Sequence, residues 1–111
     1  MEIIIESPHF ILSQQLQEYT MKKAGKLEHL DERLVKCEVL LKLDKSDTDD
    51  NKVCEIKVIG DRKSLFASSR SLTFEDAITE VIHALENQLM RQKKVARRDG
   101  EKMEMNYDLD E

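Results

Sequence analysis

The chain has few of the residues that mark membrane-spanning, disulfide-rich or metal-binding proteins. Its 111 residues include no Trp, three Gly, one Pro and two Cys. It has no apolar stretch near the roughly 20 residues of a membrane span, and the run from Ile3 to Ile5 is too short for a signal peptide. Cys37 and Cys54 belong to no CxxC pair, so neither a zinc site nor a disulfide scaffold is predicted. We therefore expect a cytoplasmic protein with no membrane partner.

The sequence also lacks the usual motifs of enzymes. The sequence contains no glycine-rich phosphate loop, nucleophile elbow or HExxH motif. His9, His29 and His83 are far apart in the chain. Cys37 and Cys54 are expected to be buried, reduced thiols on strands that pair, although a disulfide formed in oxidant would reopen a redox-sensing role. We expect no catalytic residues, no metal, no cofactor and no small-molecule substrate.

Charge is abundant and unevenly distributed. Charged residues make up 37% of the chain, and the net charge is −5. Five of the eight residues from Arg91 to Arg98 are basic, whereas the thirteen residues 99–111 carry six acids and one lysine. A phosphate responds to charge within a Debye length of about 8 Å, so a local basic patch matters more than the net charge. We predict one domain over residues 1–98, followed by an acidic, disordered tail over residues 99–111.

Hydrophobic periodicity divides the domain into six elements. Alternating apolar residues predict strands, and apolar residues at steps of three and four predict helices. Ser13 and Thr73 are expected to cap the two helices, Thr73 together with Asp76. This order predicts an α+β fold, βαβββα, with a four-stranded sheet and both helices packed on one face. The predicted elements are strands at Met1–Glu6, Val35–Leu43, 54–58 and Leu65–Arg70, and helices from Ser13 to Leu30 and from Thr73 to Arg98.

Basic side chains gather on both predicted helices. Lys23 falls near the middle of the first helix's apolar stripe, so its ammonium is expected to reach into a groove between the helices. Lys22 and Lys26 lie one turn apart beside it. Residues 74–90 of the second helix hold four acids and no Lys or Arg. One or two cations would complement the helix dipole, but five that repel one another favour phosphates as partners. The five are Arg91, Lys93, Lys94, Arg97 and Arg98.

Several segments resemble one known family. They are Lys23, Ala24, Lys26, Leu27 and Glu28, then Ala67 and Ser68, then Phe74, Ala77 and Ile78, and finally LENQLMRQKK from Leu85 to Lys94. Through them, residues 1–98 resemble the ribosome hibernation factors, the sigma-54 modulation protein family that includes the hibernation promoting factor and the ribosome-associated translation inhibitor. The resemblance implies the same βαβββα fold and binding to the small ribosomal subunit and its rRNA. The protein would bind in the channel that the mRNA and the A-site and P-site tRNAs use. Binding there would silence idle ribosomes in stress and stationary phase.

The resemblance also implies which residues bind rRNA. Asn87 departs from it, because the family often has arginine there, and Gly25 replaces the usual alanine. The chain length implies a short form without the C-terminal dimerisation domain, which we expect to be monomeric when free. The acidic extension is more like the translation-inhibitor type, which opposes ribosome pairing; a plain solubility extension is the alternative. The candidate rRNA-binding residues are Lys22, Lys23, Lys26, Arg70, Arg91, Lys93, Lys94, Arg97 and Arg98.

A second interpretation requires no ribosome. A sheet with helices on one face also describes modules that bind double-stranded RNA by its shape. The alternative function is therefore a stand-alone RNA-binding module that reads structured RNA.

Overall fold

The structure has the element order that periodicity predicts. A computed structural model describes the backbone of residues 1–45 and 48–101, and the side chains up to residue 93 apart from that gap. The order βαβββα is confirmed. The elements are β1 (Glu2–Glu6), α1 (Gln14–Leu30), β2 (Leu34–Leu43), β3 (Lys52–Gly60), β4 (Lys63–Ser71) and α2 (Phe74–Glu101).

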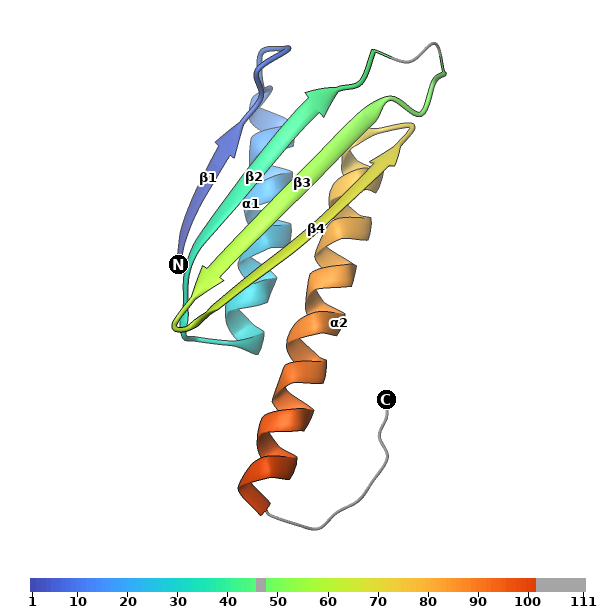
Figure 1. Cartoon of the computed structure of the whole chain (residues 1–111). Coiled ribbons are helices and arrows are strands. Elements are labelled where there is room, and N and C mark those ends of the chain that lie inside the picture. Colours follow the sequence, from blue (N-terminus) through green and yellow to red (C-terminus); the bar gives the residue numbers. More distant parts are fainter. Residues whose placement is uncertain (46–47, 102–111) are drawn as a thin grey trace.

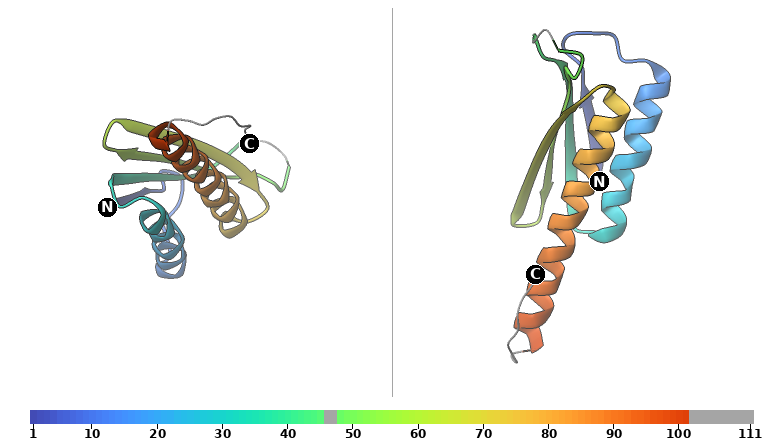
Figure 2. Two further views of the ribbon diagram at one scale, coloured as in Figure 1. Left: turned by 90° about the horizontal axis from the view of Figure 1, so that it is seen from below. Right: turned by 90° about the vertical axis from the view of Figure 1, so that its right-hand side faces the viewer.

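The four strands form one mixed sheet in the order β1-β2-β3-β4. β1 runs parallel to β2, whereas β2 with β3 and β3 with β4 are antiparallel. Both helices lie side by side on the same face of this sheet and start at the same end of it (Figure 1). In the edge-on view, no helix or strand of residues 1–45 and 48–101 covers the other face of the sheet (Figure 2). The predicted α+β sandwich is therefore confirmed.

The core lies between the sheet and the two helices. Each strand sends every second side chain toward the helices, and those side chains are mostly aliphatic because the chain has few aromatics. Thr20 is the one buried polar residue among those described, and its Oγ1 donates to the carbonyl of Leu16 at 2.7 Å. The largest fully buried side chains include Leu27, Leu41, Ile56, Ile78 and Leu85.

Both helices begin at the predicted capping residues. The hydroxyl oxygen of Ser13 accepts a hydrogen bond from the backbone N–H of Leu16 at 3.1 Å. The hydroxyl oxygen of Thr73 accepts one from the N–H of Asp76 at 3.1 Å. Each bond satisfies one of the free amides at a helix start. The starts of both helices can therefore be predicted from the local sequence alone.

Three elements, β3, β4 and α2, have an end that differs from the prediction by two residues or more. β3 and β4 are longer than the apolar runs at 54–58 and 65–70, because the backbone ladder of the hairpin continues through polar residues near the turn. α2 continues to Glu101 rather than ending at Arg98. The first three residues of the predicted tail therefore belong to the helix, and its remainder, 102–111, lies outside the described residues.

Candidate nucleic-acid interface

The lysines of α1 lie on the side of the helix that borders α2. The buried side of α1 is formed by Leu16, Thr20, Ala24 and Leu27, so Lys23 lies at the border of the apolar stripe rather than at its middle. Lys23 is half-buried, and its Nζ is 5.4 Å from the centroid of the Tyr19 ring. An ammonium over an aromatic face is attracted by the ring's electrons while it stays in contact with water.

Tyr19 shows which side of α1 faces the second helix. Its hydroxyl is hydrogen-bonded to the hydroxyl of Thr79 on α2, with an O–O distance of 2.7 Å. Lys23, one turn after Tyr19, therefore reaches the border between the two helices, as predicted. Lys22 and Lys26 are exposed on the same flank, farther from the core.

On α2 the first basic residues point to two different sides. Thr79, Glu86 and Lys93 are spaced by seven residues, so the exposed Lys93 lies on the side that borders α1. Glu80 faces β4, where its carboxylate accepts hydrogen bonds from the hydroxyls of Ser69 and Ser71. Arg91, eleven residues after Glu80, is exposed on that second side. Arg91 and Lys93, the two basic residues of this end whose side chains are described, thus lie on different sides of α2.

The basic end of α2 extends past the rest of the fold. The last turns of the helix project beyond the ends of the strands and of α1 (Figures 1 and 2). Leu89 is the last buried residue among the described side chains, and the described side chains after it, 90–93, are exposed. Lys94, Arg97 and Arg98 belong to α2, but their side chains lie outside the described part of the chain.

Arg70 lies apart from the helical lysines. It sits on the face of the sheet opposite the helices, since Ser69 and Ser71 on either side of it face α2. Its Nε donates to the carbonyl of Asp50 at 2.9 Å, and its guanidinium pairs with the carboxylate of Asp44 at 2.5 Å. The structure thus gives Arg70 a role in holding the loop between β2 and β3, and its contact with rRNA stays a prediction.

The residues considered for enzyme chemistry do not come together. His9 accepts a hydrogen bond from the N–H of Leu43 through Nδ1 at 3.2 Å, and His29 and His83 are exposed on different helices. Over residues 1–45 and 48–93, no three His, Cys, Asp or Glu side chains are placed to share a metal ion. In the same part of the chain, no helix is both long and apolar enough to cross a membrane.

The two cysteines are buried on neighbouring strands, as predicted. Cys37 pairs with Val58, whereas Cys54 pairs with Leu41, so four residues of strand, about 13 Å, separate them along the ladder. A disulfide requires Cα atoms within about 7 Å. Burial raises the pKa of the Cys37 thiol to about 11 and that of the Cys54 thiol to about 12. The register therefore argues against a redox couple.

Two arrangements were missed by reasoning from the sequence. The hydrogen bond of Tyr19 to α2 was not predicted, although a tyrosine hydroxyl at a helix border usually finds a polar partner. The uncovered face of the sheet carries Ile4, Leu40 and the exposed Phe66 beside several acids. Those residues occupy the outward positions of the strands. The alternating pattern predicts that each one points outward, but only the strand order shows which of them are neighbours across the sheet.

The fold and its charges define a two-layer α+β domain with lysines and arginines on its helical side. A family model described as "Sigma 54 modulation protein / S30EA ribosomal protein" matches residues 3–97, and the chain belongs to this family. The resemblance to the hibernation factors is thereby confirmed at the level of the family. No curated protein matches the sequence.

Two solved structures share the fold. A ribosomal subunit interface protein from Coxiella burnetii superposes with a TM-score of 0.75 and 20% identity, covering 85% of this chain and 99% of that one. The N-terminal domain of Protein Y from Thermus thermophilus has a TM-score of 0.69 and 19% identity, covering 82% of this chain and 98% of that one. At such identities the likeness establishes the fold alone.

Proposed function

We propose that this protein binds the rRNA of the small ribosomal subunit and thereby silences idle ribosomes. The bound site would be the channel used by the mRNA and by the A-site and P-site tRNAs, so that a ribosome in this state cannot translate. The observation that carries the proposal is the family match over residues 3–97, which includes α1, α2 as far as Arg97, and the candidate basic residues other than Arg98. The name of the Coxiella burnetii relative, a ribosomal subunit interface protein, points to the same partner.

The placement of the cations supports a phosphate backbone as the ligand. Lys22, Lys23 and Lys26 of α1 and Lys93 of α2 lie on flanks that border one another, and Arg91 adds a second side to the projecting helix. Exposed cations at several spacings fit successive phosphates better than one small anion. We include Lys94, Arg97 and Arg98 in the proposed contact because they continue the same helix.

Sedimentation through a sucrose gradient tests the proposal. The purified protein is mixed with small subunits or whole ribosomes, with and without mRNA and tRNA. We expect near one-to-one co-sedimentation that tRNA and mRNA relieve, together with inhibition of translation in vitro. The paired-ribosome peak of the same gradient reports whether the protein promotes or opposes pairing, and free protein is expected to sediment as a monomer.

A free RNA duplex separates this function from the alternative, whereas both functions predict salt-sensitive binding. Neutralising about five phosphates gives a log–log slope of affinity against salt of roughly −4. A stand-alone RNA-binding module would bind a free duplex as tightly as it binds the subunit. Equal affinity for both, or no association with subunits at low salt, would reject the ribosomal function.

A further inference from the structure

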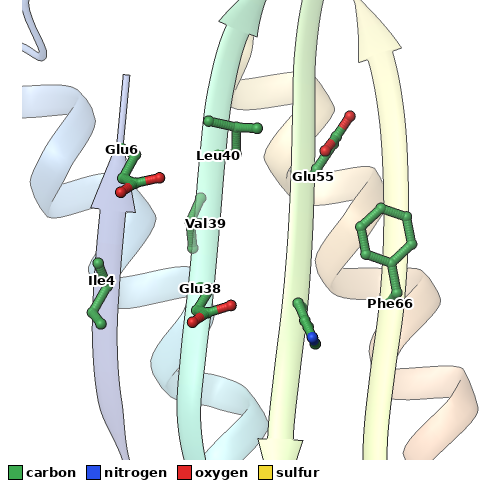
Figure 3. Close-up of a pocket in the computed structure, with 8 residues that line it drawn as sticks. Ile4, Glu6, Glu38, Val39, Leu40, Glu55 and Phe66 are labelled. Carbon is green, nitrogen blue, oxygen red and sulfur yellow. The ribbon is translucent and has the colours of Figure 1, made fainter. Parts of the chain in front are cut away.

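The face of the sheet opposite the helices has a depression of about 350 Å³. Its apolar part is formed by Ile4, Leu40 and Phe66, and Phe66 is 56% exposed. Figure 3 shows these side chains on three different strands, with the helices behind the sheet. We call the outward-pointing side chains of all four strands the outer sheet face.

The outer sheet face is rich in charge but has no net charge. Its acids are Glu2, Glu6, Glu38 and Glu55, and its bases are Lys36, Lys42, Lys57 and Arg70. Because the two signs balance, the face has no long-range attraction for RNA or for a polypeptide of either charge. The order of the side chains across the strands, rather than the net charge, therefore selects a partner.

One row of this face is complementary to its own reverse. The strand register aligns Ile4, Glu38, Lys57 and Phe66 from β1 to β4, so the row reads apolar, acidic, basic, apolar. Turned around and laid on itself, the row places Ile4 on Phe66 and Glu38 on Lys57, and each contact occurs twice. A two-fold axis parallel to the strands, between β2 and β3, gives this superposition.

Both charged residues of the row are available to a second copy. Lys57 is exposed and forms no ion pair within the described residues. Glu38 has Lys36 at 3.7 Å, and its side chain remains 43% exposed. Such an exposed pair is weak, so Glu38 can accept Lys57 of a second copy as an additional partner.

The next row accepts the same superposition. It runs from Glu6 through Leu40 and Glu55 to Ser68. Reversed, it places the carboxylate of Glu6 on the hydroxyl of Ser68 and Leu40 on the aliphatic stem of Glu55. Lys42 already holds the Glu55 carboxylate at 3.0 Å, so that charge stays compensated.

The outer rows favour this axis over the alternative one. Parallel to the strands, the axis places Glu2 on Ser64, Lys36 on Ile59 and Lys42 on Val53, so no like charges oppose each other in any row. An axis across the strands would instead place Lys36 on Lys42, and like charges that face each other oppose association.

The area of the face predicts a weak dimer. Four strands at about 4.8 Å spacing and nine residues at about 3.4 Å give a face of about 19 by 30 Å. Two such faces bury at most about 1,100 Å², just below the range of stable interfaces, which begins near 1,200 Å². Association then needs concentrations on the order of tens of micromolar, and the dilute chain in a sucrose gradient stays monomeric.

We propose that the outer sheet face binds a second copy of this chain, with Glu38 of each copy on Lys57 of the other. Sheets packed in this way keep their strand directions within about 30° of each other, so the contacts near the axis are retained. The inference does not rest on the proposed function, because the helices lie on the opposite side and no ribosome takes part.

Sedimentation equilibrium of the full chain tests the proposal. We expect a monomer–dimer equilibrium that Glu38→Lys and Lys57→Glu each weaken at least tenfold, since each variant places like charges across the interface twice. An equimolar mixture of the two variants should associate at least as strongly as the wild type, because every such pair again joins an acid to a base. The matched controls are Glu32→Lys and Lys45→Glu, exposed residues outside the four strands; alone or mixed, they should associate as the wild type does.

Several results would overturn the proposal. They are the absence of association up to about 1 mM, association that survives both reversals, and a mixture that regains nothing. If Lys57→Glu lost affinity for an RNA duplex as far as a reversal on α1 does, the face would belong to RNA. Urea denaturation checks that each variant folds. Glu38→Gln and Lys57→Gln, which should weaken association about threefold, serve in place of a reversal that unfolds the chain.

A crosslink tests the direction of the axis. The variants Ile4→Cys and Phe66→Cys are mixed and treated with a short bis-maleimide, which can join positions on stacked sheets about 10 Å apart. We expect a linked dimer from the mixture and little from either variant alone, since the axis brings residue 4 of one copy onto residue 66 of the other. Cys37 and Cys54 are buried and should not react. Equal yields from the mixture and from Phe66→Cys alone would contradict the proposed dimer.

Discussion

The hydroxyls of Tyr19 and Thr79 are hydrogen-bonded at 2.7 Å, and this bond joins α1 to α2 across 60 residues of sequence. It shows which side of each helix faces the other. Because Lys23 follows Tyr19 by one turn and Lys93 follows Thr79 by about four turns, both lysines lie on these facing sides. The packing of the two helices therefore brings lysines from both of them to the proposed rRNA-binding surface.

Loss of the Tyr19–Thr79 bond should lower stability modestly. Tyr19→Phe and Thr79→Val each remove one partner, and we expect a decrease of about 0.5 to 1.5 kcal/mol in the free energy of unfolding. The double variant should lose less than the sum of the two, because the shared bond can be lost only once. Urea denaturation of the four proteins measures this coupling. Strict additivity would show that the bond contributes nothing.

Charge reversal on α1 should weaken ribosome binding without unfolding the protein. In Lys23→Glu, Lys26→Glu we expect at least tenfold weaker binding to small subunits. The salt slope should become shallower by about two, since each lysine that contacts a phosphate contributes about one. The matched control is Lys45→Glu, Lys52→Glu, which makes the same charge change beside the loop between β2 and β3, outside both helices. If the control weakened binding equally, the helices would not be the contact surface.

Gly25 can be replaced with a gain in stability. It lies inside α1 with an ordinary backbone conformation, and an added Cβ would have no atom within 4 Å. Gly25→Ala should therefore stabilise the protein by about 0.5 to 1 kcal/mol and raise Tm by about 2 to 8 °C. Gly60→Ala is the contrasting variant, because its Cβ would lie 3.2 Å from Leu34 Cδ2 and 3.3 Å from the carbonyl of Arg33. Equal gains at both sites would contradict this explanation.

The Asp31–Lys63 ion pair should make stability depend on acid pH. Burial alone would raise the pKa of Asp31, but hydrogen bonds from Lys63, at 2.5 Å, and from Arg33 outweigh it and hold that pKa at about 2. Because the folded pKa is below the unfolded value of about 3.9, the contribution is present above pH 4 and is lost between about pH 4 and pH 2. After allowance for solvent screening it amounts to about 1 to 2 kcal/mol.

Urea denaturation from pH 6 to pH 2 measures this effect. The stability advantage of the wild type over Asp31→Asn should disappear as the pH falls from about 4 to about 2. Asp61→Asn removes an exposed carboxylate two residues before Lys63 and should follow the wild type. A difference between wild type and Asp31→Asn that stayed constant over this range would disprove the pKa argument.

The two thiols should be unreactive in the folded protein. With pKa values raised by burial to about 11 and about 12, Cys37 and Cys54 hold very little thiolate at pH 8. Labelling by a chromogenic thiol reagent should be on the order of a hundredfold slower than for free cysteine, or slower still. Both should react quickly in denaturant, and mild oxidant should form no internal disulfide in the native state. A fast-reacting thiol in the folded protein would show that the strands open locally.

The secondary structure and much of the core followed from local patterns. Alternation and helical spacing identified all six elements, and Ser13 and Thr73 marked the helix starts because a capping bond spans only three residues. The buried positions Cys37, Ile56 and Leu85 followed from the same periodicity. The strand ends were less predictable, because a backbone ladder continues past the last apolar residue.

The sequence by itself determined the six elements, their inward faces, the family and the basic end of α2, since these depend on the order of neighbouring residues. Tertiary structure decided the rest. It paired Arg70 with Asp44 and Asp31 with Lys63, turned the lysine flank of α1 toward α2, and gathered Glu6, Leu40 and Glu55 on one face. Such contacts join residues far apart in the chain, so they exist only once strand order and helix rotation are established. The proposed rRNA surface belongs to this second group.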